Sequence, residues 1–387
     1  MVTEQIAPAS VEELGLWLKE LDPGRRVVVR GLGSNLSGDH EGLTVVDTTS
    51  LAGIGHRVDD FSVTVGAGVT WATLQDQLAL VGQRVAVDPP GVGTVGAMVA
   101  TGARGGLIHR YGGIRDQIIG MTVVLADGSV AHSGSTVIKN VAGYDLAKLF
   151  AGSRGRFGII AEVIFRTRPL PETQRTLLVT TRPDRLRDVI IALMGAHVEL
   201  SALDLVDDTL SGLIEGGHEV IDQRIERLER AVSGSSTMIL GEAESVAHWS
   251  RLRGFQLPGE GGMVFALSAR STAMLDLLPT IRATLGPALV ALVAHVGAGV
   301  AEISVQPEHQ EHRLANLQGV LGAGAVEARA WHPHGILAHE TWSRTLATAV
   351  RHVTDDSEVG TAATISAQLL IDRIAMAFDP YGRFYRS

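Results

Sequence analysis

Three glycine clusters in the first 160 residues have the spacing to bind phosphate. They are RGLGSNL at 30–36, GVGTVG at 91–96 and GSRGRFG at 152–158. Successive backbone N–H groups in such loops form concave sites for anions, and the two arginines of the third cluster can pair with phosphate. Taken alone, each cluster is equally compatible with an ordinary turn that binds nothing. Together they predict one extended, dinucleotide-sized ligand that the backbone contacts at several points.

The second cluster matches the G-x-G-x-x-G pattern of NAD-binding sites. That pattern requires a strand directly before it and a helix directly after it. Asp88, Pro89 and Pro90 interrupt the chain where the strand is needed, so NAD binding is not favoured. A helix expected over 96–101 would still direct free N–H groups at a pyrophosphate.

A few polar residues could do acid–base or anion-binding chemistry. The weak candidates for a catalytic role are His109, Arg110, Tyr144 and His295. Histidine transfers protons near neutral pH, and arginine pairs with carboxylates. Packing explains Tyr144 equally well, and an ordinary strand position explains His295. The pair His332 and His334 has no recognisable carboxylate ligand beside it, so we expect no metal site.

Composition excludes several classes of protein. The 387 residues contain no cysteine, which rules out thiolate zinc sites, cysteine-ligated iron–sulfur clusters and cysteine-linked flavin within them. A net charge of −9 without a basic run argues against nucleic-acid binding. No long apolar run predicts direct membrane insertion, and the acidic start does not resemble a secretory signal. We expect a cytoplasmic protein whose membrane association, if any, is through partner subunits.

The chain divides into two regions with different patterns of expected strands and helices, and these elements must position the residues named above. The opening has capping-box spacing at Ser10 and Glu13 before an amphipathic run. Short strands joined by glycine turns follow, at 26–30, 43–47, 61–65 and 159–166, with a helix between Thr70 and Gly82. After Pro171, longer helical patterns appear at 184–196, 220–232, 272–285, 309–321 and 341–353, with strands at 263–269, 288–296 and 300–305. The second region is therefore predicted to be a separate α+β domain.

The ordered clusters resemble a known family. VVVRGLGSNL, DPPGVGTVGAMVATGARGG and KNVAGYDL with its following glycine loop and strand resemble the FAD-binding domain of the vanillyl-alcohol oxidase, or PCMH, type. Within it, they are most similar to the FAD-binding E subunits of bacterial glycolate oxidases. The resemblance covers about residues 10–172, weakens afterwards and returns loosely at AFDPYGRF.

This resemblance implies a fold and a cofactor. The fold is α+β: a PCMH-type FAD-binding domain of two α/β subdomains over 1–172, an α+β cap or substrate domain over 173–365, and a C-terminal segment over 366–387 that returns toward the FAD domain. FAD is expected to be non-covalent, because Ser34 stands where some relatives attach flavin to histidine. By matching position, the resemblance implies FAD contacts from Arg30, Gly31, Leu32, Gly33, Ser34, Asn35, Pro90, Gly91, Gly93, Thr94, Val95, Gly96, Ala97, Ala100, Thr101, Gly105, Gly106, Gly155, Phe157, Gly158, Ile159 and Ile160.

The resemblance also implies an activity. It is FAD-dependent oxidation of a small 2-hydroxy acid of the glycolate or D-lactate type, or relay of its electrons in a complex with a second flavin subunit and an iron–sulfur subunit. Many related dehydrogenases carry His-x-Gly-Asp-Gly-Asn-x-His, but here only His295 and the glycines remain, and Ala298, Val300 and Glu302 replace the other ligands. We expect the Glu302 carboxylate to repel an acid substrate. A free-standing dehydrogenase of another hydroxy acid or alcohol, and an inactive flavin-binding scaffold, are the alternatives.

Overall fold

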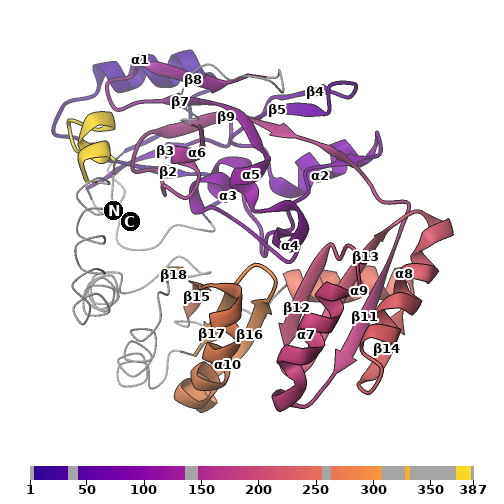
Figure 1. The fold of residues 1–387 in the computed structure, drawn as a ribbon. Helices are drawn as coiled ribbons and strands as arrows, with labels where there is room; N and C mark the ends of the chain where they lie inside the picture. Colours follow the sequence, from indigo (N-terminus) through magenta and orange to yellow (C-terminus); the bar gives the residue numbers. More distant parts are fainter. Residues whose placement is uncertain are drawn as a thin grey trace.

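The first 170 residues form two main sheets, which lie above the large sheet built by the later residues (Figure 1). A computed structural model describes residues 4–33, 42–135, 147–254, 263–306, 327–331 and 372–384. The first sheet is parallel, with the order β1 (Glu4–Ile6), β3 (Thr44–Asp47), β2 (Val27–Arg30). The second is antiparallel, with the order β4 (Ile54–Arg57), β5 (Ser62–Gly66), β9 (Ile159–Arg166), β7 (Ile118–Val124), β8 (Val130–Gly134).

The helices of this first unit are short, apart from two. They are α1 (Val11–Glu20), α2 (Trp71–Ala79), α3 (Val95–Thr101), α4 (Ile108–Tyr111), α5 (Ile114–Gln117) and α6 (Ala147–Phe150). The predicted capping box is confirmed at α1, where the Glu13 amide donates to Ser10 Oγ at 3.1 Å and the Ala9 amide donates to Glu13 Oε2 at 2.7 Å. Two short strands, β6 (Gln83–Arg84) and β10 (Arg168–Pro169), pair with each other in antiparallel orientation.

The second unit is one large antiparallel sheet with helices on both faces. Its order is β14 (Ser236–Leu240), β11 (Thr173–Thr180), β13 (Thr209–Gly216), β12 (Ala202–Val206), β16 (Leu289–His295), β17 (Val300–Val305), β15 (Met263–Ser268), β18 (Glu327–Trp331). Its helices are α7 (Leu186–Gly195), α8 (His218–Ala231), α9 (Glu242–Arg253) and α10 (Ser271–Leu285), with 3-10 turns η1 (Pro183–Arg185) and η2 (Gly286–Ala288).

The alternation of side chains along the strands sorts this sheet into an apolar and a polar face. Leu203 and Leu205 of β12, like Ile303 of β17, join the core under α7, α8 and α10. The residues between them point to the opposite face, as the two-residue period of a strand requires. There Trp249 of α9 donates from Nε1 to Thr176 Oγ1 at 2.9 Å. This opposite face is the one turned toward the first unit.

The C-terminal residues pack on the first unit. Residues 372–378 are helical, and Phe378 contacts Phe150 and Phe157 edge to face or tilted. The buried Arg383 guanidinium donates to three backbone carbonyls, at Leu18, at Leu21 (2.7 Å) and at Ala126 (2.6 Å). The Val27 amide donates to Arg383 O at 2.7 Å, so this segment extends the sheet beside β2. Because β2 leads directly into the first glycine cluster, the C-terminal segment supports that cluster.

Most expected elements agree with the structure, and the differences have physical reasons. The strands expected around 26–30, 43–47, 61–65 and 159–166 and the helices around 184–196, 220–232 and 272–285 are present with shifted ends. Residues 309–321 and 341–353 lie outside the described residues. Helix α9 was not expected, because its polar and apolar residues form no clear stripe and it buries little besides Ser245 and Trp249.

Candidate functional site

The three glycine clusters converge on helix α3. A Cβ on Gly31, in the first cluster, would lie 2.8 Å from Thr94 Cγ2, so the first and second clusters are in close contact. In the third cluster, the Gly152 amide donates to Val99 O at 2.9 Å, and the Arg154 amide donates to Ala100 O at 2.8 Å. Both acceptors belong to α3. The fold therefore gathers loops that are about 120 residues apart in the sequence.

The backbone amides of the first two clusters are available to an anionic ligand such as a pyrophosphate. Among the described residues, no acceptor is recorded for the backbone N–H groups of 31–33 or of 91–93. Gly33 and Gly91 have φ values of +80° and +77°, which are conformations that favour glycine. Leu32 and Val92 are 53% and 75% exposed, so the backbone of both loops is open to a ligand. Successive amides without an acceptor are the hydrogen-bond donors that an anionic group needs.

The expected contribution of the α3 N-terminus is corrected by its hydrogen bonds. The Val95 amide donates to Val69 O at 2.8 Å, and the Gly96 amide donates to Ala67 O at 2.9 Å. The Ala97 amide donates to the Thr94 hydroxyl at 3.3 Å. The first turn of α3 therefore has no free donors, and a phosphate would have to be bound by the loops that precede it.

The other residues that the resemblance implies as FAD contacts are either half-buried or part of the core. Pro90, Ala97, Ala100 and Thr101 are half-buried. Arg30 is engaged, since its guanidinium donates to Asp47 Oδ2 at 3.0 Å. The core residues are Gly93, Thr94, Val95, Phe157, Gly158, Ile159 and Ile160, and Gly155 is half-buried with φ +75°. Ser34, Asn35 and Tyr144 lie outside the described residues.

Gly105 and Gly106 lie where the first unit meets the second. A Cβ on Gly105 would lie 2.6 Å from Asp88 Oδ1, and a Cβ on Gly106 would lie 2.9 Å from Asp204 Oδ2. Asp88 is buried and accepts a hydrogen bond from the Leu107 amide at 2.9 Å. The absence of side chains at both glycines thus lets the polar face of the second sheet approach the loop that leads into the second glycine cluster.

A buried histidine–aspartate pair lies on that polar face. His295, the last residue of β16, and Asp204 of β12 are direct cross-strand neighbours. Their Nδ1 and Oδ1 atoms are 2.8 Å apart, and the side chains are 4% and 2% exposed. The remaining ring nitrogen, Nε2 of His295, is buried without a hydrogen-bond partner. An orphaned polar atom of this kind is uncommon in proteins and marks a place to look for a ligand.

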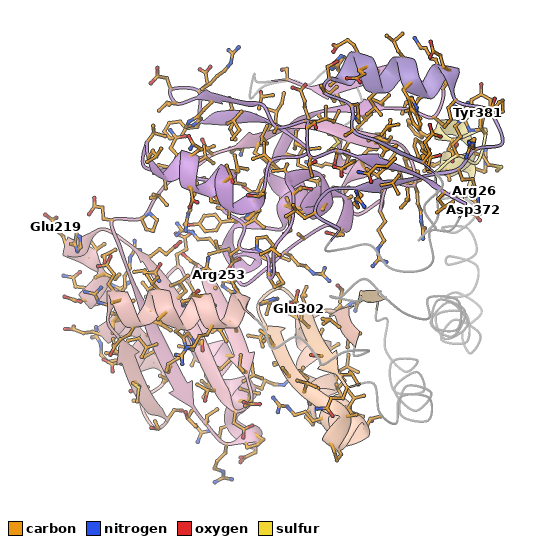
Figure 2. All side chains as sticks on the ribbon, turned by 180° about the vertical axis from the view of Figure 1, so that it is seen from behind. Arg26, Glu219, Arg253, Glu302, Asp372 and Tyr381 are labelled. Atoms are coloured by element: carbon orange, nitrogen blue, oxygen red, sulfur yellow. The ribbon has the colours of Figure 1, made fainter. Side chains whose placement is uncertain are left out.

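Acidic and basic side chains from both units surround this pair. Burial alone would lower the pKa of His295, but the Asp204 carboxylate reverses the effect and raises that pKa to about 9. Burial raises the pKa of Asp88 to about 6, although the Leu107 amide and the Arg253 charge oppose it. His295 is therefore charged at neutral pH and forms an ion pair with the Asp204 carboxylate. Figure 2 shows Arg253 and Glu302 at the level where the two units meet.

Glu302 is a buried acidic residue close to the histidine–aspartate pair. Burial raises the pKa of its carboxyl group, against the opposing charges of His295 and Arg104. Its side chain is 6% exposed on β17, on the same face as His295. The raised pKa weakens the tendency of Glu302 to carry a charge, and the expected repulsion of an acid substrate by its carboxylate stays a prediction.

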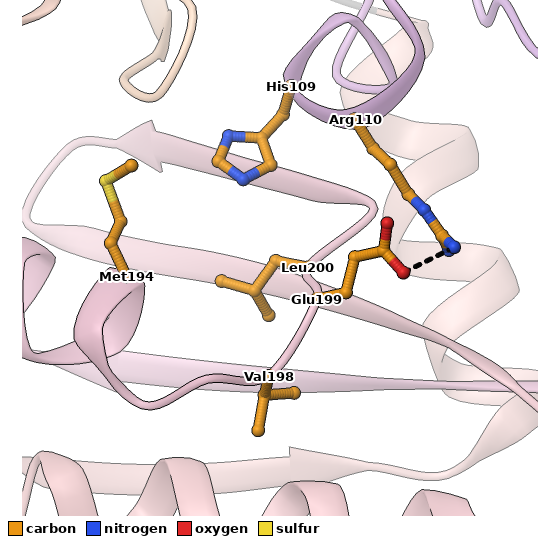
Figure 3. A pocket seen from close by; sticks show the side chains of 6 residues that line it. All are labelled: His109, Arg110, Met194, Val198, Glu199 and Leu200. Atoms are coloured by element: carbon orange, nitrogen blue, oxygen red, sulfur yellow. Dashed lines mark ion pairs between the residues drawn. The ribbon is translucent and has the colours of Figure 1, made fainter.

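His109 and Arg110 approach the same junction from helix α4. A Cβ on Gly297 would overlap the His109 ring, so His109 contacts the turn that follows His295 directly. His109 Nδ1 is buried without a partner, and burial lowers the pKa of the ring against the pull of Asp204. On the solvent side, a cavity of about 270 Å³ is lined by His109, Arg110, Met194, Val198, Glu199 and Leu200. Figure 3 shows the Arg110–Glu199 ion pair at this cavity, with a 2.6 Å separation.

A second set of contacts fixes the two units at the other end of the junction. The Arg84 guanidinium of β6 donates to both carboxylate oxygens of Glu215 in β13, at 2.6 and 2.7 Å. The Tyr111 hydroxyl donates to Glu215 Oε2 at 3.2 Å, and Arg84, Arg110 and Arg168 all lie within 5.4 Å of the Tyr111 ring centroid. This bidentate pair holds α4, and with it His109, against the second sheet.

The structure assembles two groups that the sequence did not single out. Asp88 precedes the second glycine cluster by three residues, and Asp204 is the one charged residue in the apolar run ALDLV. A carboxylate in a buried strand is a signal for a paired or functional group. Within the described ranges, no group of three or more His, Asp or Glu side chains is arranged to hold a metal ion. No helix in this part of the chain is long and apolar enough to cross a membrane.

Comparison with known proteins identifies the first unit. A family model described as "FAD binding domain" matches residues 5–134. The chain is 29% identical to glycolate oxidase subunit GlcE of Escherichia coli over 62% of its own length and 64% of that protein's length. It is 30% identical to glycolate oxidase subunit GlcD of Bacillus subtilis over 54% of this chain and 46% of that protein. Against the mitochondrial D-lactate dehydrogenase [cytochrome] of Arabidopsis thaliana, identity is 35% over 39% of this chain and 27% of the relative.

A solved structure shares the overall fold. An alkyldihydroxyacetonephosphate synthase superposes with a TM-score of 0.66 and 14% identity, covering 98% of this chain and 74% of that protein. At this identity the likeness concerns the fold, a PCMH-type arrangement of helices and sheets. The alignments with the first curated relatives span only about a quarter to two fifths of their length. The matched domain establishes FAD as the cofactor of this chain.

Proposed function

We propose that this chain is the FAD-binding subunit of an enzyme that oxidises a small 2-hydroxy acid of the glycolate or D-lactate type. The observation that carries the proposal is the FAD-binding domain placed directly against a buried, charged His295–Asp204 pair of the second unit. The names of the relatives, glycolate oxidase subunits and D-lactate dehydrogenases, support the substrate class. Bound FAD supplies the oxidising chemistry, and the protein supplies binding and orientation.

The chain's own residues have distinct tasks in this proposal. The free amides of 31–33 and 91–93 hold the pyrophosphate, because they are paired with no acceptor of the described chain. The junction of the two units excludes water from the region around His295, which strengthens every charge interaction there. The bidentate Arg84–Glu215 pair keeps the junction closed.

The finer features of the proposal concern attachment and partners. FAD is bound non-covalently, since Ser34 occupies the position of the histidine that some relatives use. The resemblance to glycolate oxidase E subunits supports a working enzyme with a second flavin subunit and an iron–sulfur subunit. Because these 387 residues contain no cysteine, any iron–sulfur cluster of that enzyme lies in a partner. The complex is cytoplasmic, with any membrane association through those partners. Acid precipitation should release all yellow colour into the supernatant, and colour in the pellet would contradict non-covalent binding.

Absorbance of the purified protein tests the main proposal. We expect flavin bands that bleach slowly, under anaerobic conditions, when glycolate or D-lactate is added to the isolated chain. Turnover with an artificial acceptor should rise when the partner subunits are co-expressed. Bleaching by dithionite alone, with or without partners, would support an inactive scaffold instead. Turnover on the order of 10 per second by the isolated chain, an ordinary value for enzymes, would show that this subunit is complete without partners.

A further inference from the structure

Strand β14 forms one edge of the large sheet of the second unit. It pairs antiparallel with β11 in an unbroken register, from Thr176↔Leu240 to Thr180↔Ser236, and no other strand of the described residues pairs with it. Figure 1 shows β14 at the end of the sheet opposite β15 and β18. In an antiparallel pair, alternate residues direct both backbone groups away from the partner strand. The outer side of β14 therefore presents hydrogen-bonding groups to a further strand.

This edge has none of the features that usually prevent pairing. Natural edge strands are protected by a charge, a proline, a bulge or a covering segment. The sequence STMIL has no charge and no proline, and its pairing with β11 has no bulge. Met238, on the face that α9 covers, is 61% exposed, and Ile239, on the face of α8, is 41% exposed. Both faces of the edge are therefore apolar and open, which is typical of a site for strand addition.

The strand is complementary to a second copy of itself. In an antiparallel pair centred on Met238, the two Met238 side chains lie opposite each other, and Thr237 of each copy lies opposite Ile239 of the other. Apolar and β-branched pairs of this kind stabilise neighbouring strands, and no like charges meet. A two-fold axis perpendicular to the sheet generates this arrangement and closes the assembly at two copies.

The charges on either side of the strand favour the same arrangement. Arg227 and Arg230 lie near the end of α8, before β14, and both are exposed. Glu242 and Glu244 begin α9, directly after β14, and both are exposed. Antiparallel pairing brings the end of one strand beside the start of the other, so the acidic start of α9 in one copy approaches the basic end of α8 in its partner. Parallel pairing would align like charges instead.

We propose that β14 pairs with β14 of a second copy of this chain, so that the two large sheets join into one continuous sheet of a homodimer. The proposal goes beyond the proposed function and does not depend on the substrate or on the other subunits. An interface built around one strand of five residues is small, so we expect a dissociation constant on the order of micromolar.

A single introduced cysteine tests the pairing directly, because the chain has no cysteine of its own. Directly opposite Cα atoms of antiparallel strands are about 4.5–5.5 Å apart, within the distance that a disulfide spans. Under mild oxidation of the FAD-loaded chain at micromolar concentration, Met238→Cys should form a covalent dimer. Ile239→Cys should form it at least about 10-fold more slowly, because diagonal neighbours are too far apart. Met376→Cys is the control, since Met376 is 58% exposed on the C-terminal helix.

Charge substitutions test the same pairing without oxidation. Met238→Lys and Met238→Glu should each fold, because the Met238 side chain is mostly exposed, and circular dichroism and flavin absorbance check this. Each variant should weaken self-association by roughly 10-fold or more, because like charges would lie opposite each other. An equal mixture of the two variants should regain the dimer, which analytical ultracentrifugation measures. Met376→Lys should associate like the wild type.

Three results would overturn the homodimer. The first is equal rates of covalent dimer formation for Met238→Cys and Met376→Cys. The second is a wild type that sediments as a monomer far above micromolar concentration. The third is a Met238→Cys variant that forms no covalent dimer alone and is shielded from thiol reagents only when partner subunits are co-expressed, which would assign the edge to a different subunit. None of these results bears on FAD binding or on 2-hydroxy acid oxidation.

Discussion

Replacing His295 by glutamine should change how stability depends on pH. The Asp204 carboxylate raises the pKa of His295 from 6.5 to about 9. In the unfolded chain the ring loses its proton near 6.5, whereas in the folded chain it keeps it until about 9. The folded state therefore binds more protons in this window, and stability must fall as pH rises. The contribution of the pair is fully present below pH 6.5 and is lost above pH 9.

The size of the effect follows from the shift. A change of about 2.5 pKa units at ~1.36 kcal/mol per unit gives about 3 kcal/mol of unfolding free energy. Urea titrations followed by circular dichroism, with saturating FAD, should show the wild type losing about 3 kcal/mol more than His295→Gln between pH 6 and 9.5. His132→Gln is the control, because His132 is exposed on β8, and it should keep the wild-type dependence. Parallel pH profiles for the wild type and His295→Gln would refute the charged His295–Asp204 pair.

Four further substitutions test the packing around the site. Gly96→Val should destabilise the fold by about 1–3 kcal/mol, because a Cβ there would lie 2.8 Å from Ala67 Cβ; an unchanged urea midpoint would count against this contact. Arg84→Met should lower the free energy of unfolding by about 3–5 kcal/mol, because it leaves the buried Glu215 carboxylate without its partner. Glu215→Gln should lower that free energy by less in the same titration. Arg383→Met leaves three backbone carbonyls without a donor and should lower the free energy of unfolding by about 2–3 kcal/mol. It should also weaken FAD binding measured by fluorescence. An unchanged FAD affinity would contradict the view that the C-terminal segment supports the first glycine loop.

Local patterns were sufficient for many elements because their signals are local. Ser10 and Glu13 interact across a single turn, so their spacing alone predicts the cap of α1. Glycine clusters between short apolar runs mark turns for the same reason. Helix α9 was not predicted, because its apolar residues form no clear stripe and its one large buried side chain is Trp249. Its position is set by the sheet beneath it and not by its own periodicity.

The candidate site shows a similar division between local and distant information. Ordered glycine loops indicated a dinucleotide-sized ligand, and His109 and His295 stood out as polar candidates by residue type alone. The sequence also suggested that Gly96 would face a phosphate. The structure instead directs Gly96 at Ala67 and uses its amide in a hydrogen bond to Ala67 O. Which amides are free depends on the segments that pack against the loop, and the sequence of the loop does not specify those segments.

The sequence by itself determined the glycine-rich turns, the absence of thiol chemistry in these residues and the approximate positions of many strands and helices, because composition, turn residues and strand periodicity act over a few residues. Only the tertiary structure decided that Asp204 meets His295, which is 91 residues away in the chain. The pairing depends on the register of β12 against β16, and a shift of one residue would turn both side chains to the other face. Burial at the junction then sets the charges of His295, His109 and Glu302, because desolvation and neighbouring charges exist only once the two units have come together.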